Sequence, residues 1–388
     1  MEGISEKIQI TVLQEGYSSF AKNVKACSHG GKVLLFAEED RCGEDAQAAL
    51  AFEGLQIVKR DLSRRIEEEN PLHQNNLPEG IMAIVGVGGV RAMEAAKARP
   101  LGGQMERILF PTDFSALSAL DERCFVGLKK DILRLRSEGH VVLFDSKILS
   151  KSSEIKAGLG FLLARYVEEI DAIYERLLLS GENPAAALRT VKEHANTLRN
   201  LREEAPAESL SEVGFTLLKD SPCEISDSAH LLAFLAAREK GENYAEYLFP
   251  ASYALIRLYA AYLGDLPLEH CPPPDRARNA DLLEKKCDIS ASVTLGRGKA
   301  YVDDYDKRAH DTAEYREDFL DCLSESVLPL SLLSRIYRRA PISGENRKML
   351  TAKELLALLS LTGEAVSGYP LLKHIKMTGV LEPLLDCA

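Results

Sequence analysis

Short apolar runs recur along the first 148 residues of the chain and are separated by helical or polar segments. Segments with helical spacing lie at about 43–53 and 91–99. Strands that alternate with helices predict βαβ units and a mostly parallel sheet, because parallel neighbours need a crossover connection. The runs with the composition of buried strands are 32–37, 55–60, 81–86, 107–110 and 141–145.

The pattern changes after about residue 148, where amphipathic helical spacing replaces the strand signals. We therefore predict an α/β, Rossmann-like domain with a mostly parallel sheet over residues 1–148, followed by an all-α domain over residues 149–388. The helical patterns lie at roughly 155–180, 183–202, 208–219, 226–240, 245–264, 311–326, 328–339 and 351–361.

The charge balance argues against nucleic acid as a partner. The formal net charge is −11, so a phosphate backbone would be repelled by the surface as a whole. A local cluster of basic residues could still bind a small phosphorylated ligand, although a solvated helix surface is the favoured interpretation of this cluster. This cluster comprises Arg123, Lys129, Lys130, Arg134 and Arg136.

The spacing of the cysteines and the lengths of the apolar runs indicate the cellular compartment. None of the eight Cys forms a CxxC pair, and the N-terminus has no apolar segment of signal length, so we expect reduced thiols and a cytoplasmic protein. No apolar run approaches the roughly 20 residues needed to cross a bilayer, so no membrane is expected as a partner.

The sequence Gly86-Val87-Gly88-Gly89 follows a predicted strand and opens a predicted helix. Glycines at such a turn let the backbone approach a pyrophosphate, and the helix N-terminus supplies N–H donors. A tight strand-to-helix turn without a ligand explains the same residues equally well.

Further motifs follow the glycine turn in order. Pro111-Thr112 comes next, with Ser115 three residues later, and Asp145 ends the last strand. After these come the motifs Ala157-Gly158-Leu159-Gly160, Ser221-Pro222 and Ser226-Asp227-Ser228-Ala229-His230. In this succession the chain resembles, over about residues 30–265, the sn-glycerol-1-phosphate dehydrogenases. Their superfamily includes glycerol dehydrogenase, iron-containing alcohol dehydrogenases and 3-dehydroquinate synthase.

The resemblance implies a dehydroquinate synthase-like fold. An N-terminal domain would bind NAD or NADP, with Gly86, Val87, Gly88, Gly89, Pro111, Thr112 and Ser115 as the cofactor-binding residues. A helical domain would hold a divalent metal, and a small-molecule ligand would lie in the cleft between the domains. The superfamily also makes a homodimer plausible.

The same resemblance implies that the metal site is degenerate. The family holds its metal with one carboxylate and two His, and here Phe161 stands at the carboxylate position, His230 at the first His and Phe249 at the second. One imidazole does not retain a catalytic cation against water, so a divalent metal is not expected. An alignment shifted by three residues would bring Glu246, Asp227 or Glu224 into the site and leave a rebuilt metal site open.

Two further positions carry apolar residues where the family has acidic ones, and two other features have simple structural interpretations. The family's acidic residue on the helix after the glycine turn falls at Ala92, and its substrate-contacting Asp falls at Leu117, with Asp113 and Asp121 nearby. Without the family, His230 would be interpreted as a buried, hydrogen-bonded side chain. The run Asp303-Asp304-Tyr305-Asp306 lacks the spacing of a calcium loop and is expected to be an exposed acidic loop.

Three functions remain open. The first is a dehydrogenase-fold protein that has lost metal-dependent catalysis and retains nucleotide or phosphorylated small-molecule binding. The second is an active NAD(P)-dependent oxidoreductase that acts on a glycerol-phosphate-like polyol with a rearranged site around His230. The third is a non-catalytic subunit of a hetero-oligomer or a scaffold, motivated by the segment after residue 270, in which no family motif is recognised.

Overall fold

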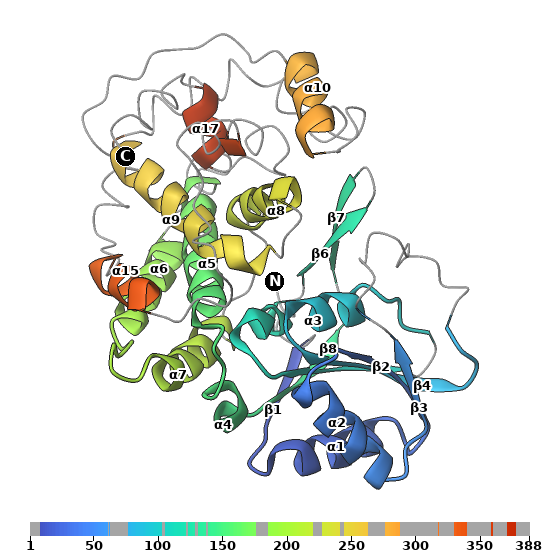
Figure 1. Cartoon of the computed structure of the whole chain (residues 1–388). Coiled ribbons are helices and arrows are strands. Elements are labelled where there is room, and N and C mark those ends of the chain that lie inside the picture. Colours follow the sequence, from blue (N-terminus) through green and yellow to red (C-terminus); the bar gives the residue numbers. More distant parts are fainter. Residues whose placement is uncertain are drawn as a thin grey trace. The chain divides into compact units, whose positions relative to one another are not determined.

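A computed structural model gives the structure of the chain as two compact units (Figure 1). Unit 1 comprises residues 1–158 and 202–223, and unit 2 comprises residues 159–201 and 224–388. The residues that the structure describes are 8–60, 62, 77–102, 105–121, 123–128, 131–136, 139–175, 185–219, 227–240, 244–262, 276–287, 317, 330–339, 358–359 and 371–377.

Unit 1 is built on a six-stranded sheet whose strand pairs are all parallel, in the order β1-β8-β5-β4-β2-β3. The central strands are apolar on both faces because helices cover both, with α1 and α2 on one face and α3 on the other (Figure 1). The strands are β1 (Ile8–Val12), β2 (Lys32–Ala37), β3 (Ile57–Arg60), β4 (Ile81–Gly88), β5 (Glu106–Pro111) and β8 (His140–Phe144).

The helices of unit 1 connect or flank these strands. The side chain of Asp40 caps the N-terminus of α2 by accepting from Gly43 N–H at 2.8 Å. Asp145 caps α4 in the same way and also accepts from Gly16 N–H at 3.1 Å. The helices are α1 (Gly16–Cys27), α2 (Arg41–Phe52), α3 (Val90–Lys97), the 3-10 helix η3 (Phe114–Leu120), α4 (Ser146–Leu149) and α7 (Pro206–Lys219).

A two-stranded antiparallel hairpin, β6 (Arg123–Leu128) with β7 (Asp131–Arg136), follows η3. This corrects the interpretation of the basic cluster as a helix surface, since Arg123, Arg134 and Arg136 belong to strands. Alternation of apolar and charged residues along 131–136 is typical of a strand. The other two members of the cluster, Lys129 and Lys130, lie outside the described residues.

Unit 2 is helical throughout its described part. The long helix α5 begins at Ile155, so the two units divide within it, whereas the sequence placed the division at residue 148; α7 belongs to unit 1, where it contacts α4 and η3. The helices of unit 2 are α5 (Ile155–Glu175), α6 (Ala185–Leu198), α8 (Ser228–Lys240), α9 (Ala245–Tyr262), α10 (Arg276–Cys287), α15 (Leu330–Arg339) and α17 (Leu371–Met377).

The carboxylate of Asp171 joins four segments of unit 2. It accepts hydrogen bonds from the Ser228 hydroxyl, the Tyr259 hydroxyl and the Leu371 backbone N–H, each at 2.9 Å. Since Asp171 is buried on α5, these bonds fix α8, α9 and α17 against it. Within the described ranges, no helix combines the length and apolar character that a membrane span needs.

Candidate functional sites

The glycine turn lies at the topological switch point of the parallel sheet. From β2 the chain continues outward to β3, and from β4 it continues in the opposite direction to β5, so the order of strands reverses between β2 and β4. Ligands of open parallel sheets bind beyond the carboxyl ends of the strands at such a point. At these ends, β2 finishes at Ala37 and is followed by Glu38, and β4 finishes at Gly88 and is followed by Gly89.

The four residues of the predicted turn have different roles. Gly86 and Val87 lie inside β4, and a Cβ on Gly86 would come within 3.0 Å of Ala92 O and Ala96 Cβ, so Gly86 lets α3 pack closely on the strand. Gly88 has a φ of +125°, which favours glycine. Gly89 is the N-cap residue of α3.

The structure brings the Pro-Thr segment to this turn. Pro111 pairs with Gly88 across β5 and β4, and Thr112 N–H donates to Gly88 O at 3.1 Å. The hydroxyl of Ser115 accepts a hydrogen bond from Val90 N–H, the first residue of α3, at 2.9 Å. Residues more than 20 positions apart in the sequence therefore form one cluster at the N-terminus of α3.

Two carboxylates that the sequence analysis did not assign to this site complete it. A Cβ on Gly89 would lie 2.7 Å from Asp113 Oδ2, 2.7 Å from Ser115 Oγ and 3.1 Å from Glu38 Oε1, so a methyl group there would have to displace these side-chain ends. Glu38 therefore lies close to Gly89. Its position directly after a buried parallel strand was the available signal.

Burial and neighbouring carboxylates raise the pKa values of both acids. The pKa of Glu38 rises to about 7, first because of burial and then because of Asp113 and Asp40, while Arg91 opposes the shift. Burial also raises the pKa of Asp113, against hydrogen bonds from Ser115. Negative charge at the N-terminus of a helix is favourable, but two neighbouring carboxylates disfavour each other.

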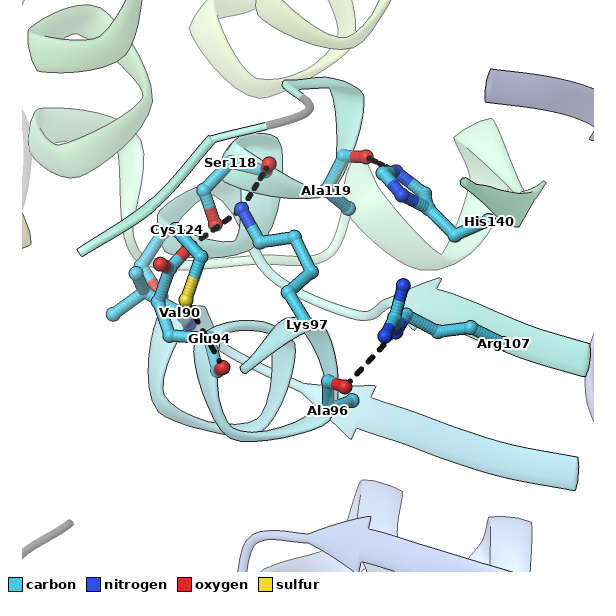
Figure 2. Close-up of polar contacts among 10 residues, drawn as sticks. Val90, Glu94, Ala96, Lys97, Arg107, Ser118, Ala119, Cys124 and His140 are labelled. Carbon is cyan, nitrogen blue, oxygen red and sulfur yellow. Dashed lines mark hydrogen bonds and ion pairs between the residues drawn. The ribbon is translucent and has the colours of Figure 1, made fainter. Parts of the chain in front are cut away.

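The face of α3 that points into unit 1 carries a buried ion pair (Figure 2). Lys97 Nζ lies 2.8 Å from Glu94 Oε1 and donates to Ser118 O at 3.0 Å. Cys124 Sγ donates to Glu94 O at 3.4 Å, which ties β6 to the same helix. The acidic side chain of this helix is thus Glu94, two residues beyond Ala92, and it serves packing.

Arg107 and His140 bind the carbonyl groups at the ends of α3 and η3. Arg107 Nε donates to Ala96 O at 3.1 Å, and its other nitrogens reach Arg99 O and Gly139 O. His140 Nε2 lies 2.7 Å from Ala119 O and donates to it (Figure 2). Burial, followed by the charges of Lys97 and Arg107, lowers the pKa of His140 to about 3. These contacts hold α3, and with it the glycine turn, in place.

In unit 2, Phe161 lies beside His230, and helix α9, which carries Phe249, approaches α5. The ring centroids of Phe161 and His230 are 5.8 Å apart. A Cβ on Gly160 would lie 2.7 Å from the backbone nitrogen of Phe249, so α5 and α9 approach closely at this level. The ring of Phe249 stacks on Tyr337 at 3.9 Å. Aromatic contacts therefore occupy the place that the resemblance assigns to a cation.

The side chains present do not fit a divalent metal. Phe161 and Phe249 offer no donor atom, and both are buried. His230 Nε2 lies 3.6 Å from Glu168 Oε1 of α5, a carboxylate that the shifted alignment did not name. Within the described residues, no group of three or more His, Cys, Asp or Glu is placed to hold an ion. A metal-dependent step cannot be built from these donors.

His230 belongs to a buried chain of ionisable groups. Glu168 also pairs with Arg165 Nη1 at 3.4 Å, and Arg165 Nε lies 3.5 Å from Glu169. Glu169 in turn lies 3.0 Å from His194 Nδ1 on α6. The chain links α5, α6 and α8, and each carboxylate has a cationic or imidazole partner, which buried carboxylates require.

The other residues considered in the sequence analysis lie away from these sites or outside the described residues. Leu117 is buried in η3, where it packs near Gly214 of α7. Ser221, Pro222, Ser226, Glu224 and the run Asp303–Asp306 lie outside the described residues.

Comparison with known structures identifies the fold. The chain is similar to glycerol dehydrogenase from Schizosaccharomyces pombe (TM-score 0.54, 13% identity, 98% of this chain and 90% of the other). It is also similar to an iron-containing alcohol dehydrogenase from Thermotoga maritima (0.52, 12%, 98% of each chain) and a probable glycerol dehydrogenase from Sinorhizobium meliloti (0.51, 17%, 92% and 97%). The chain has the fold of these dehydrogenases.

This result confirms the predicted fold class, a parallel α/β unit with a helical unit in a dehydroquinate synthase-like fold. The sequence itself matches no protein-family model and no curated protein. At identities of 12–17%, the likeness extends to the fold and leaves the chemistry to be argued from the residues.

Proposed function

We propose that this protein binds a nicotinamide dinucleotide at the glycine turn of unit 1 and has lost metal-dependent alcohol oxidation. The observation that carries the proposal is the packing of Phe161 against His230, with Phe249 on the adjacent helix. In the sn-glycerol-1-phosphate dehydrogenases that the chain resembles, these three positions hold the metal. In this chain, two of the three positions have phenyl side chains, which contain no donor atom for a metal.

Replacement of metal-binding side chains by phenylalanine changes how unit 2 could activate an alcohol. A bound cation lowers the pKa of an alcohol oxygen and stabilises the charge that develops as hydride leaves. A phenyl ring supplies neither effect. The rings of Phe161 and Tyr244 also lie 6.5 Å apart, so the same region is filled by side chains. We therefore infer that glycerol or glycerol-1-phosphate is not oxidised through a metal-bound oxygen.

The nucleotide part of the proposal is supported by the geometry of unit 1. The turn lies at the switch point, Gly88 needs its positive φ, and a Cβ on Gly89 would meet the side-chain ends of Asp113 and Ser115. The backbone of Gly88 and Gly89, with the hydroxyls of Thr112 and Ser115, would hold the phosphates. NAD or NADP would supply a hydride acceptor, which leaves metal-independent redox chemistry open to this chain.

Binding, metal content and turnover test the proposal together. We expect NAD or NADP to raise the melting temperature, since a ligand that binds only the native state stabilises it. Gly89→Ala should lose that shift, whereas Gly214→Ala, whose Cβ makes ordinary contact at 3.4 Å, should keep it. Metal analysis by mass spectrometry should find less than one divalent ion per chain. Turnover of glycerol-1-phosphate that requires a stoichiometric divalent ion would contradict the proposal.

A second candidate function is metal-independent oxidation in which His230 accepts a proton. The observation that favours it is the Glu168 carboxylate 3.6 Å from His230 Nε2, since a carboxylate orients an imidazole and stabilises its protonated form. His230→Gln would then abolish NAD-dependent oxidation of a polyol that persists in a chelator. Full activity in this variant would exclude the role.

A further inference from the structure

The strand β1 forms one edge of the six-stranded sheet of unit 1 (Figure 1). It runs parallel to β8, with Ile8 opposite His140 and Val12 opposite Phe144. In the part of the chain that the structure describes, β8 is the one strand that pairs with β1. The other side of an edge strand presents a row of backbone N–H and C=O groups to which a further strand can bind.

The register with β8 shows which backbone groups of β1 point to this open side. Leu13 N–H donates to Phe144 O at 2.8 Å, so the odd-numbered residues of the strand direct their N–H and C=O groups toward β8. These directions alternate along a strand, so the N–H and C=O groups of Ile8, Ile10 and Val12 point away from β8. Among the described residues, none is hydrogen-bonded to these outward groups.

The strand lacks the features that usually protect a sheet edge, which are charged residues, Pro and bulges. Its sequence, Ile8-Gln9-Ile10-Thr11-Val12, contains neither charge nor Pro, and its pairing with β8 has no register shift. By contrast β3, at the opposite edge, ends in Lys59-Arg60. The apolar side chain of Val12 is 57% exposed. In a chain with a net charge of −11, this uncharged strand lets two copies meet without like charges on the strand itself.

The sequence of β1 is also complementary to itself. In an antiparallel pair centred on Ile10, Ile8 of one copy faces Val12 of the second, Ile10 faces Ile10, and Gln9 faces Thr11. Because side chains alternate between the two faces of a sheet, apolar residues meet on one face and polar residues on the other. The pairs made by Ile8, Ile10 and Val12 are those with outward backbone groups, so each pair can exchange both of its N–H···O bonds.

We propose that β1 is a homodimer interface, in which two copies pair antiparallel through β1 about a two-fold axis at Ile10 and join their sheets. A two-fold axis uses the same patch of both copies, which the self-complementary register provides. The pairing covers Val12 with Ile8 of the second copy. Since β1 has 5 residues, the interface is small, and we expect a dissociation constant of about 1–100 µM. This inference does not depend on the proposed nucleotide binding.

Sedimentation velocity of the full chain measures the oligomeric state. Over a concentration series that spans the expected dissociation constant, wild-type protein should pass from monomer to dimer. Val12→Lys should weaken dimerisation by about tenfold or more, because a lysine on an edge strand opposes pairing. The matched control is Phe52→Lys, which makes the same kind of change at another apolar residue of unit 1, 90% exposed, and should dimerise like wild type.

Ile10→Pro tests the backbone part of the pairing. Proline removes the N–H at the centre of the proposed pair but no N–H that β8 uses, and edge strands tolerate a proline whose nitrogen faces outward. Circular dichroism should therefore show a folded protein, and sedimentation should show a monomer at concentrations where wild type is a dimer. If this variant does not fold, Val12→Lys decides the question, because its side chain is already largely exposed.

Cysteine cross-linking tests the register. Gln9 of one copy and Thr11 of the second would form a non-hydrogen-bonded pair with Cα atoms about 4.5 Å apart, which a disulfide can span. Gln9→Cys protein mixed with Thr11→Cys protein should therefore cross-link under mild oxidation. Either variant alone should cross-link far less, because its two cysteines would be diagonal neighbours about 7–8 Å apart. Peptide mass spectrometry distinguishes this disulfide from any formed by native cysteines.

The outcomes decide the inference in either direction. Loss of the dimer in Val12→Lys, together with cross-linking in the mixed sample, would support it. Wild-type protein that stays monomeric throughout the series would overturn it, and so would a dimer that persists in both Val12→Lys and Ile10→Pro. A variant without residues 1–7 that dimerises where wild type does not would show that the same chain covers the edge, which also overturns it.

Discussion

The ring of Phe161 lies 5.8 Å from the imidazole of His230, centroid to centroid, in the interior of unit 2. Both side chains are buried, so the contact is shielded from water. A carboxylate placed at this position would lose its hydration without gaining a full set of ligands. The pair thus makes the loss of the metal site testable through stability and not only through activity.

Restoring the carboxylate should harm the protein. We expect Phe161→Asp to lower the free energy of unfolding by about 3–5 kcal/mol, since it removes a buried ring and buries an ionisable group. Phe161→Leu, which keeps an apolar side chain, should cost about 1–2 kcal/mol. Denaturant titration in the presence and absence of Zn²⁺ measures both. A Phe161→Asp variant as stable as wild type and holding one ion would show that a metal site persists.

Gly160 should be sensitive to any side chain. Its Cβ would lie 2.7 Å from Leu248 Cβ and from the backbone nitrogen of Phe249, so α5 and α9 would have to separate. We expect Gly160→Ala to cost about 1–3 kcal/mol of stability. Gly214→Ala is the control, because its Cβ has room and the change favours a helix; it should be neutral or stabilise by up to about 1 kcal/mol. Equal effects in thermal denaturation would argue against close packing of the two helices.

Asp171 should be among the most costly residues of unit 2 to replace. Its carboxylate accepts three hydrogen bonds, from Ser228, Tyr259 and Leu371. Asp171→Ala leaves buried donors without their acceptor, which should cost about 3–5 kcal/mol in chemical denaturation. Tyr259→Phe removes one of the three and should cost about 1–2 kcal/mol. A small effect of Asp171→Ala would mean that packing alone positions these helices.

His140 should make the protein less stable in acid. Its pKa is about 3 in the folded protein and near 6.5 when unfolded, so between these values the unfolded chain binds more protons. Stability is full above about pH 6.5 and falls as pH decreases, by up to about 1.4 kcal/mol per pH unit from this group. His140→Gln, which can still donate to Ala119 O, should reduce the slope. The exposed His29, changed to Asn, is the control; a slope unaltered in His140→Gln would refute the assignment.

Most strands and helices could be predicted because their patterns are local. The apolar runs at 32–37, 81–86 and 107–110 became β2, β4 and β5 almost to the residue. The edge strand β1 was not predicted, since it is half exposed and carries few buried residues. The hairpin at 123–136 was misinterpreted as a helix surface. Basic residues are also common on solvated helices, and the two-residue alternation typical of a strand covers only a few residues here.

The candidate sites were predicted less completely. The glycine turn and the Pro-Thr segment were found from their motifs, and the structure places Gly88, Gly89, Thr112 and Ser115 together. The acid beside Gly89 was missed, because Glu38 has no motif of its own and precedes the turn by about 50 residues. The charged chain from His230 to His194 was missed for the same reason, as its members belong to three helices.

The sequence by itself determined the order of strands and helices and the chemical identity of each side chain. Periodicity is a local property, and phenylalanine lacks a metal-binding atom in any fold. Only the tertiary structure decided which groups meet. Parallel strands bring the segments after β2, β4 and β5 to one edge of the sheet, so Glu38 and Asp113 approach Gly89. Helix packing turns His230 toward Glu168 and Phe161, because contacts between helices depend on distances that no spacing along the chain records.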